Sequence, residues 1–220
     1  MILSNEGIRR SLDSGEVVIE PRPRRDQYTT SAVDLFLGDD FRVWDSSRFE
    51  APGVRVELNL AQQEFQRTAA AYLVPAQREP DGSLVFPPHS RTPYHLLAVT
   101  RERVHLKHES KLAARVEGRS SFARLGLMVH LTAPTIHAGF NGRITLEMIN
   151  HGPFYLRLVP GATRVCQLIF ERLEDAPEGE IATGFQGQDL ASGGTSTSGI
   201  DSESSRRGER VDVQRPTRRE

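Results

Sequence analysis

The densest group of residues able to do chemistry lies near the middle of the chain, over residues 117–126. The sequence there is Glu-Gly-Arg-Ser-Ser-Phe-Ala-Arg-Leu-Gly, which sets a glycine, an arginine and two hydroxyls side by side. Backbone N–H groups, hydroxyls and the Arg119 guanidinium suit the oxygens of a phosphate, because arginine forms bidentate, charge-assisted hydrogen bonds. An ordinary surface turn has the same composition, so the segment alone leaves both interpretations open.

A carboxylate that could act as a general base follows at Glu147. Within residues 143–150 the apolar side chains fall at every second position: Ile144, Leu146 and Met148. In a strand, alternate side chains point to opposite faces, so Glu147 points away from the more apolar face, beside Thr145. Glu147 is either a solvated carboxylate on a strand or a general base held on a rigid element.

Short β-branched runs separated by proline, glycine and aspartate make up most of the chain. These candidate strands are residues 17–19, 54–58, 72–74, 95–99, 104–106, 127–132, 143–150, 155–159 and 165–170. So many short strands at this spacing predict an all-β sandwich or barrel.

One short helix is predicted at the N-terminus, and the helical period largely disappears after it. Ser4 or Asn5 can cap this helix, Ile8 and Leu12 lie four residues apart on one face, and Gly15 can end it.

Composition limits the classes of function. With 37% apolar residues, the chain suits one domain. Its net charge of −1 creates no overall electrostatic field that would attract nucleic acid or an acidic membrane. No apolar run is long enough to span a membrane and no secretory leader is visible, so we expect a soluble cytoplasmic protein. A single cysteine, Cys166, excludes an intrachain disulfide and a multi-thiolate metal site; we expect it to be a small buried hydrophobe.

The C-terminal end differs in composition from the rest of the chain. Residues 192–199 are all glycine, serine or threonine, and residues 201–220 combine six arginines with five acids. Such a segment buries too little surface to offset the entropy of ordering it. We therefore expect a domain over residues 1–191 and a disordered, arginine-rich tail over residues 192–220.

Several motifs in one order resemble the dCTP deaminase branch of the dUTPase-like superfamily. The principal matches are Gly-Arg-Ser-Ser-x-Ala-Arg-x-Gly at 118–126, His-x-Thr-Ala at 130–133 and Gly-Phe-x-Gly-x-Ile-Thr-Leu-Glu at 139–147. Supporting matches lie at 31–38, at 160–161 with 165–168, and at 185–188. The resemblance covers residues 1–190, with a poor match over residues 59–92.

The resemblance implies a distorted jelly-roll β-barrel that assembles as a homotrimer with active sites at subunit boundaries. The implied reaction is hydrolytic deamination of dCTP to dUTP and ammonia, with Mg²⁺ accompanying the triphosphate. Neither a nucleic acid nor a membrane is an implied partner.

The resemblance also assigns roles to individual residues. Glu147 is the general base and proton shuttle, and Ser120, Arg124 and the Ala133 carbonyl hold the attacking water and the exocyclic amine. Arg119 and Ser121 bind phosphates, and Ile136 and Phe140 enclose the sugar. The complete set assigned to substrate binding is Arg119, Ser121, Thr132, Ile136, His137, Phe140, Gln167, Phe185 and Gln188.

A carboxylate base is chemically sufficient for this reaction. Water is a poor nucleophile at neutral pH, so its proton must be removed as the C–O bond forms. The familiar zinc solution needs one histidine and two cysteines, and one cysteine cannot supply them. A positioned carboxylate contributes about 10²–10⁴-fold, with further stabilisation from arginine and backbone dipoles.

The chain departs from the family pattern at three places. Thr135 stands where much of the family has arginine, Gly184-Phe185 replaces a Lys-Tyr pair, and His137 replaces an aspartate. In relatives that cleave the triphosphate, that aspartate activates the hydrolytic water, so we expect dUTP rather than dUMP as the product. A dUTP pyrophosphatase and a non-catalytic nucleotide-binding trimer remain the alternatives. We expect His130, between the motifs, to be a structural histidine near the site.

Overall fold

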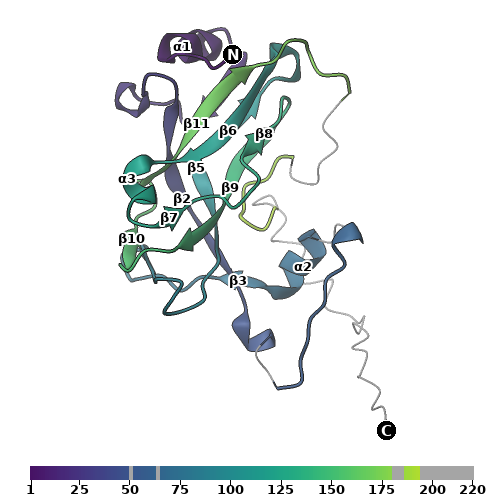
Figure 1. Ribbon diagram of the computed structural model, residues 1–220. Coiled ribbons are helices and arrows are strands. Elements are labelled where there is room, and N and C mark those ends of the chain that lie inside the picture. The colour runs from purple at the N-terminus through teal and green to yellow at the C-terminus, as the bar shows by residue number, and fades with distance from the viewer. Residues whose placement is uncertain (50–51, 63–64, 180–185, 194–220) are drawn as a thin grey trace.

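A strongly curled antiparallel sheet dominates the computed structural model, which describes residues 1–49, 52–62, 65–179 and 186–193. Its strands follow the spatial order β7-β9-β5-β2-β11-β6-β8, with β1 added beside β5 and β3 beside β2 (Figure 1). A second, two-stranded sheet pairs β10 with β4. The strands are β1 Val17–Glu20, β2 Val33–Trp44, β3 Leu73–Pro75, β4 Leu84–Phe86, β5 Leu96–Leu106, β6 Leu112–Gly118, β7 Leu127–Met128, β8 Thr135–Ile136, β9 Asn141–Asn150, β10 Leu156–Leu158 and β11 Arg164–Arg172.

Helices are few and lie around the sheet. They are α1 Asn5–Asp13, α2 Phe65–Tyr72 and α3 Ser120–Ala123, with 3₁₀ turns η1 Arg25–Gln27, η2 Ser46–Arg48, η3 Leu60–Gln62 and η4 His108–Ser110. This mostly-β, barrel-like architecture confirms the predicted fold class.

The curl of the sheet places one face of every long strand inside. Along β9, buried residues alternate with partly exposed ones, and the inward-facing Leu146 and Met148 are fully buried. Irregular register interrupts β2 between Leu37 and Phe41, where β2 crosses β5. A Cβ on Gly38 would lie 2.9 Å from two carbonyl oxygens of β5, so this bend requires glycine.

The predicted N-terminal helix is confirmed. The Ser4 hydroxyl accepts a hydrogen bond from the Gly7 N–H at 3.3 Å, which caps α1, and the predicted apolar pair Ile8 and Leu12 is buried. Gly15 follows with a positive φ of 74°, the conformation that lets the chain leave the helix and enter β1.

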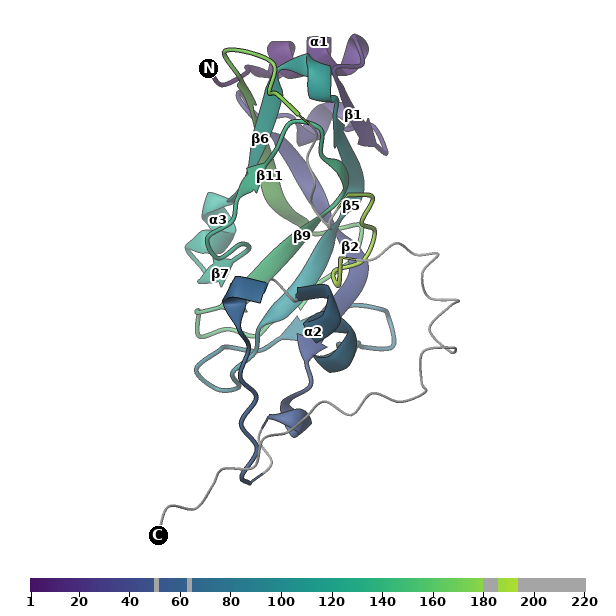
Figure 2. The same ribbon diagram turned by 90° about the vertical axis from the view of Figure 1, so that its right-hand side faces the viewer.

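A second helix, α2, corrects the expectation that helical structure ends near Gly15. Its Thr-Ala-Ala-Ala run at 68–71 is a strong helix former, and the helix is short because β3 begins at Leu73. Phe65, at its start, packs on a small cluster on the outer face of the sheet that includes the buried Leu97 and Val99. Figure 2 shows α2 beside β5 and β2 at one end of the sheet.

The predicted strands are confirmed in part. The two runs at 95–99 and 104–106 belong to one strand, β5, that continues across a register shift between Val99 and Arg103. The run at 127–132 gives only the two-residue β7. The strand predicted at 54–58 is wrong, because no strand among the described residues pairs with this stretch. Strands β2 and β6 were not among the candidates.

The predicted polar tail falls almost entirely on residues 194–220, which lie outside the described residues. In the part of the chain that is described, no helix is long and apolar enough to cross a membrane. Cys166 is fully buried in the main core, as expected for a small hydrophobe, and burial raises the pKa of its thiol.

Candidate active site

Glu147 occupies the outward-facing side of β9, as the alternation predicts. In the register between β5 and β9 it lies opposite Leu97, a buried member of the outer cluster. Its neighbours Leu146 and Met148 point the other way, into the main core. The carboxylate is thus half-buried beside apolar side chains while it sits on a strand that is paired on both sides.

The surroundings of Glu147 favour a proton-accepting role. Burial raises the pKa of its carboxyl group above the ordinary range of glutamate. The backbone of Glu147 itself, the nearby backbone of Leu131 and the nearby His130 imidazole act in the opposite direction and lower that pKa. A general base works best when its pKa approaches the operating pH, so a carboxyl raised by burial suits this task.

The Arg-Ser-Ser motif begins the short helix α3. Backbone N–H groups of Phe122 and Ala123 both bond the Arg119 carbonyl at 2.9 Å, which fixes the first turn. Ser120, Ser121 and Arg124 are exposed on this turn. In the described part of the chain neither serine hydroxyl has a hydrogen-bond partner and the Arg124 guanidinium has no ion pair, so all three are available to a ligand.

Two glycines hold α3 against the end of β9. The His151 N–H donates to the Gly126 carbonyl at 2.8 Å, and β7 pairs Met128 with Ile149. A Cβ on Gly152 would lie 1.8 Å from the Leu125 carbonyl oxygen, and one on Gly126 would lie 2.2 Å from the Gly152 nitrogen. This close backbone contact brings the segment after the Arg-Ser-Ser motif to the strand that carries Glu147.

A groove lies between the segment around α3 and β7, the loop that carries His130, and the end of β9 near His151. Its lining includes His130, Leu131 and His151, and the full set is Gly118, Ala123, Gly126, Leu127, Met128, Val129, His130, Leu131 and His151. The Nδ1 atom of His130 is buried and lacks a hydrogen-bond partner among the described residues. The loop that lies near Glu147 therefore also borders an open groove next to α3.

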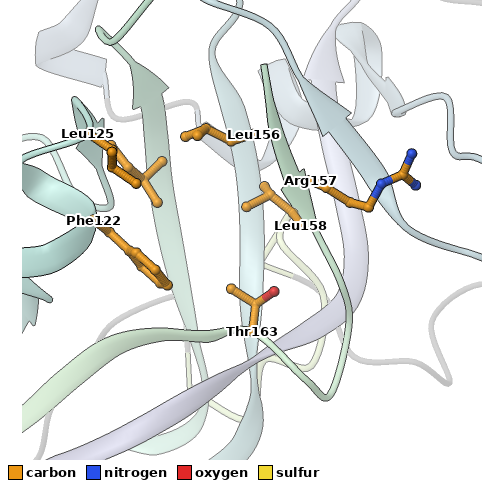
Figure 3. Close-up of a pocket in the computed structure, with 7 residues that line it drawn as sticks. Phe122, Leu125, Leu156, Arg157, Leu158 and Thr163 are labelled. Atoms are coloured by element: carbon orange, nitrogen blue, oxygen red, sulfur yellow. The ribbon is translucent and has the colours of Figure 1, made fainter. Parts of the chain in front are cut away.

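A small apolar pocket lies behind α3. Figure 3 shows Phe122 and Leu125 facing Leu156 and Leu158 of β10, with Thr163 at the edge and the Arg157 guanidinium turned away. These apolar contacts position a four-residue helix that could not be stable alone.

Two residues predicted to bind substrate, Arg119 and Gln167, meet at a buried carboxylate, Asp34. The Gln167 Nε2 donates to Asp34 at 3.1 Å, and the Arg119 guanidinium lies 3.6 Å from the same carboxylate. Arg164 lies 3.7 Å from it as well. Asp34 thus orients two of the predicted binding residues from β2, across β11 and β6.

The other residues predicted to contact the substrate lie either in the loop after His130 or further along the chain, in and after β8. Thr132 and Ala133 are exposed in the loop that follows His130 and Leu131, so they lie close to the site in sequence and in space. Ile136 is buried on β8, Phe140 packs against the main core, and His137 is exposed.

Gln188 lies at the start of β9 rather than beside Glu147. Its Nε2 donates to the Arg143 carbonyl at 2.8 Å, and the Arg143 N–H donates back to the Gln188 carbonyl at 2.9 Å. Arg143 and Glu147 are four residues apart, about 13 Å along a strand. Phe185 lies outside the described residues.

Two residues near the site had no assigned function from the sequence. Asp34 is the acid inside the apolar run Val33-Asp34-Leu35, and a lone carboxylate in such a run is a signal for a buried hydrogen-bonded group. His130, expected only to be structural, lies next to Glu147 and lines the groove.

The fold and site together define a class: a mostly-β protein with a half-buried carboxylate on a paired strand, and with exposed hydroxyls and a guanidinium group on the short helix α3. The sequence model of the family described as dCTP deaminase-like matches residues 2–173. The chain belongs to this dCTP deaminase-like family.

Curated relatives agree with this assignment. The chain is 38% identical over 182 residues to a dCTP deaminase of Rhodospirillum rubrum, covering 79% of this chain and 83% of the relative. It is 40% identical over 174 residues to a dCTP deaminase of Shewanella oneidensis, covering 79% and 84%. It is 38% identical over 178 residues to a dUMP-forming dCTP deaminase of Methanobrevibacter smithii, covering 80% and 83%.

A solved structure shows the same fold. The 2'-deoxycytidine 5'-triphosphate deaminase of Agrobacterium tumefaciens matches with a TM-score of 0.55 at 20% identity, over 78% of this chain. The match spans 48% of that solved chain, about half of its length.

Proposed function

We propose that this protein catalyses the hydrolytic deamination of dCTP to dUTP and ammonia in the cytoplasm. The observation that carries the proposal is the half-buried Glu147 carboxylate, whose pKa is raised by burial and which lies near His130 and Leu131 of the groove. Relatives at 38% to 40% identity are named dCTP deaminases, which supports the same substrate.

The proposed chemistry needs Glu147 to move protons. The carboxylate takes a proton from water as the water oxygen bonds to C4 of cytosine. Glu147 then returns that proton to the ring nitrogen, and a second transfer from the new hydroxyl to the amine lets ammonia leave. Ser120, Arg124 and the Ala133 carbonyl orient the water and the amine, and Arg119 with Ser121 binds the phosphates.

Mg²⁺ enters this proposal with the triphosphate as part of the substrate. The described residues contain no group of three or more histidine, cysteine, aspartate or glutamate side chains able to hold a resident ion. The ion's role is to offset phosphate charge beside Arg119 and the backbone N–H groups of the Arg-Ser-Ser motif.

A homotrimer with sites at subunit boundaries is part of the same proposal. No hydrogen bond or ion pair joins Glu147 to Ser120 or Arg124 within the described chain, although the proposed chemistry needs all three groups at one substrate. A neighbouring subunit would complete the set. Size-exclusion chromatography with light scattering tests this, and a stable monomer with full activity would contradict it.

We also propose dUTP rather than dUMP as the product. The exposed His137 stands where a triphosphate-cleaving relative has aspartate, and a histidine differs from it in size and placement. Chromatography of early time points with dCTP and Mg²⁺ distinguishes the two products. Accumulation of dUMP from the start would show that the chain also cleaves the triphosphate.

Ammonia release from dCTP, beside CTP and dUTP, tests the central proposal. We expect ammonia from dCTP with little from CTP. Tight dCTP binding without ammonia would favour the non-catalytic nucleotide-binding alternative.

A further inference from the structure

Residues 54–60, here called the arm segment, have the pattern of a strand outside any sheet. Their apolar side chains fall at every second position: Val54, Val56, Leu58 and Leu60. Three of these are strongly exposed, Val54 at 46%, Leu58 at 49% and Leu60 at 85%. The arm segment therefore presents an apolar stripe to solvent next to a polar one.

Residues 54–59 of the arm segment lie in no helix or strand and are unpaired among the described residues, and Leu60 begins the 3₁₀ turn η3. Arg55 and Glu57, two residues apart, form an ion pair at 3.0 Å, which requires both side chains on one face of an extended chain. The described residues supply no backbone hydrogen bond to residues 54–59. Figures 1 and 2 show this stretch running apart from the sheet. Unpaired backbone groups on an apolar strand are a template for another strand.

The sequence of the arm segment is complementary to itself when two copies run antiparallel. If the pairing is centred on Val56, Arg55 of each copy lies opposite Glu57 of the other, which makes two ion pairs across the contact. Val54 of each copy then lies opposite Leu58 of the other. A parallel, in-register pairing would place arginine against arginine and glutamate against glutamate, which is destabilising.

We propose that the arm segment is an interface between two copies of this chain, paired antiparallel about Val56 with twofold symmetry. The contact satisfies the free backbone groups and aligns the apolar stripes of both copies on one face. It is independent of the proposed activity, and it joins two protomers or two of the proposed trimers. A two-stranded contact is marginal in water, so its extent rises with protein concentration.

Charge reversal tests the pairing. Glu57→Arg places Arg55 opposite a second arginine, so light scattering over a concentration series should show half the wild-type particle mass. The double variant Arg55→Glu, Glu57→Arg restores opposite charges and should recover the wild-type mass. Equal masses for the wild type and Glu57→Arg at every concentration would overturn the proposal, as would failure of the double variant to recover.

A cysteine pair locates the symmetry axis even when association is weak. Val56→Cys lies opposite itself across the axis and should form a disulfide-linked dimer under mild oxidation. Leu58→Cys is the matched control, because the two copies of residue 58 would be separated by about 13 Å along the strands. The native Cys166 is fully buried, which shields its thiol from the oxidant in the folded protein. Equal cross-linking of the two variants would contradict the proposed register.

Discussion

Strand β9 and the arm segment share one sequence pattern and differ in every structural consequence. Both alternate apolar and polar residues, yet β9 is paired with β5 on one side and β7 on the other, whereas the arm segment pairs with no strand in the part of the chain that the structure describes. Leu146 on β9 is fully buried, while Leu58 on the arm segment is about half exposed. The alternation of apolar and polar residues gives a strand one apolar and one polar face, but only contacts with neighbouring strands determine whether either face is buried.

The comparison also explains why β9 suits the general base that we propose. Pairing on both sides holds its backbone still, and the inward residues anchor it in the core. The outward face is then free to present Glu147 beside Leu97 and the Leu131 N–H. The arm segment lacks such support and suits association instead of catalysis.

The largest expected effect follows from removing the base on β9. Glu147→Gln keeps the shape of the side chain but cannot accept a proton, so turnover of dCTP should fall by about 10²–10⁴-fold. Ammonia release measures the loss, and dCTP binding should persist. Glu109→Gln, at an exposed carboxylate in η4, is the control and should keep wild-type turnover. Near-full activity of Glu147→Gln would rule out its assigned role.

Truncating one leucine in each region compares their contributions to stability. Leu146→Ala leaves a cavity in the core and should lower the free energy of unfolding by about 2–5 kcal/mol. Leu58→Ala removes an exposed side chain and should change it by less than about 0.5 kcal/mol. Urea unfolding at low protein concentration measures both. Similar losses for the two variants would show that the arm segment packs on the body of the protein.

The pH dependence of the free energy of unfolding should show the effect of burial on the Glu147 carboxyl. Because the folded pKa of Glu147 is raised, the folded protein binds its proton more tightly than the unfolded chain does. Stability from this group is present below the ordinary glutamate pKa and is lost as pH rises through the raised value. Glu147→Gln should therefore gain stability over the wild type across that window and keep the gain above it.

The pH dependence of dCTP turnover should also reflect the ionisation of Glu147. The base must be ionised, so the acid limb of kcat should lie above the ordinary glutamate pKa. A limb within the ordinary range would mean that burial does not control this carboxyl when substrate is bound.

The smallest effect is expected at the C-terminus, whose sequence has neither an apolar alternation nor a helical period. A chain ending at residue 193 should keep the melting temperature of the full chain, because glycine, serine and arginine there offer little apolar surface to bury. A large drop in melting temperature would show that the polar end contributes to the fold.

Much of the site could be predicted from the chain itself. The alternation over 143–150 places Glu147 on the less apolar face, and the motif order identifies the Arg-Ser-Ser turn and the His-x-Thr-Ala loop. The cap at Ser4 with the pair Ile8 and Leu12 predicts α1. These features depend on local conformation or on short spacing, which the sequence records directly.

Pairing between distant segments determined the rest. The two-residue strand β7 and the contact between Gly126 and Gly152 bring the His130 loop to Glu147. No local sequence pattern predicts this strand or this contact. The run at 54–58 has a strand's alternation but pairs with no strand within residues 1–49, 52–62, 65–179 and 186–193. A sequence specifies by its periodicity which side of a strand is apolar. Register and neighbours depend on long-range backbone hydrogen bonds and packing, which only the tertiary structure decides.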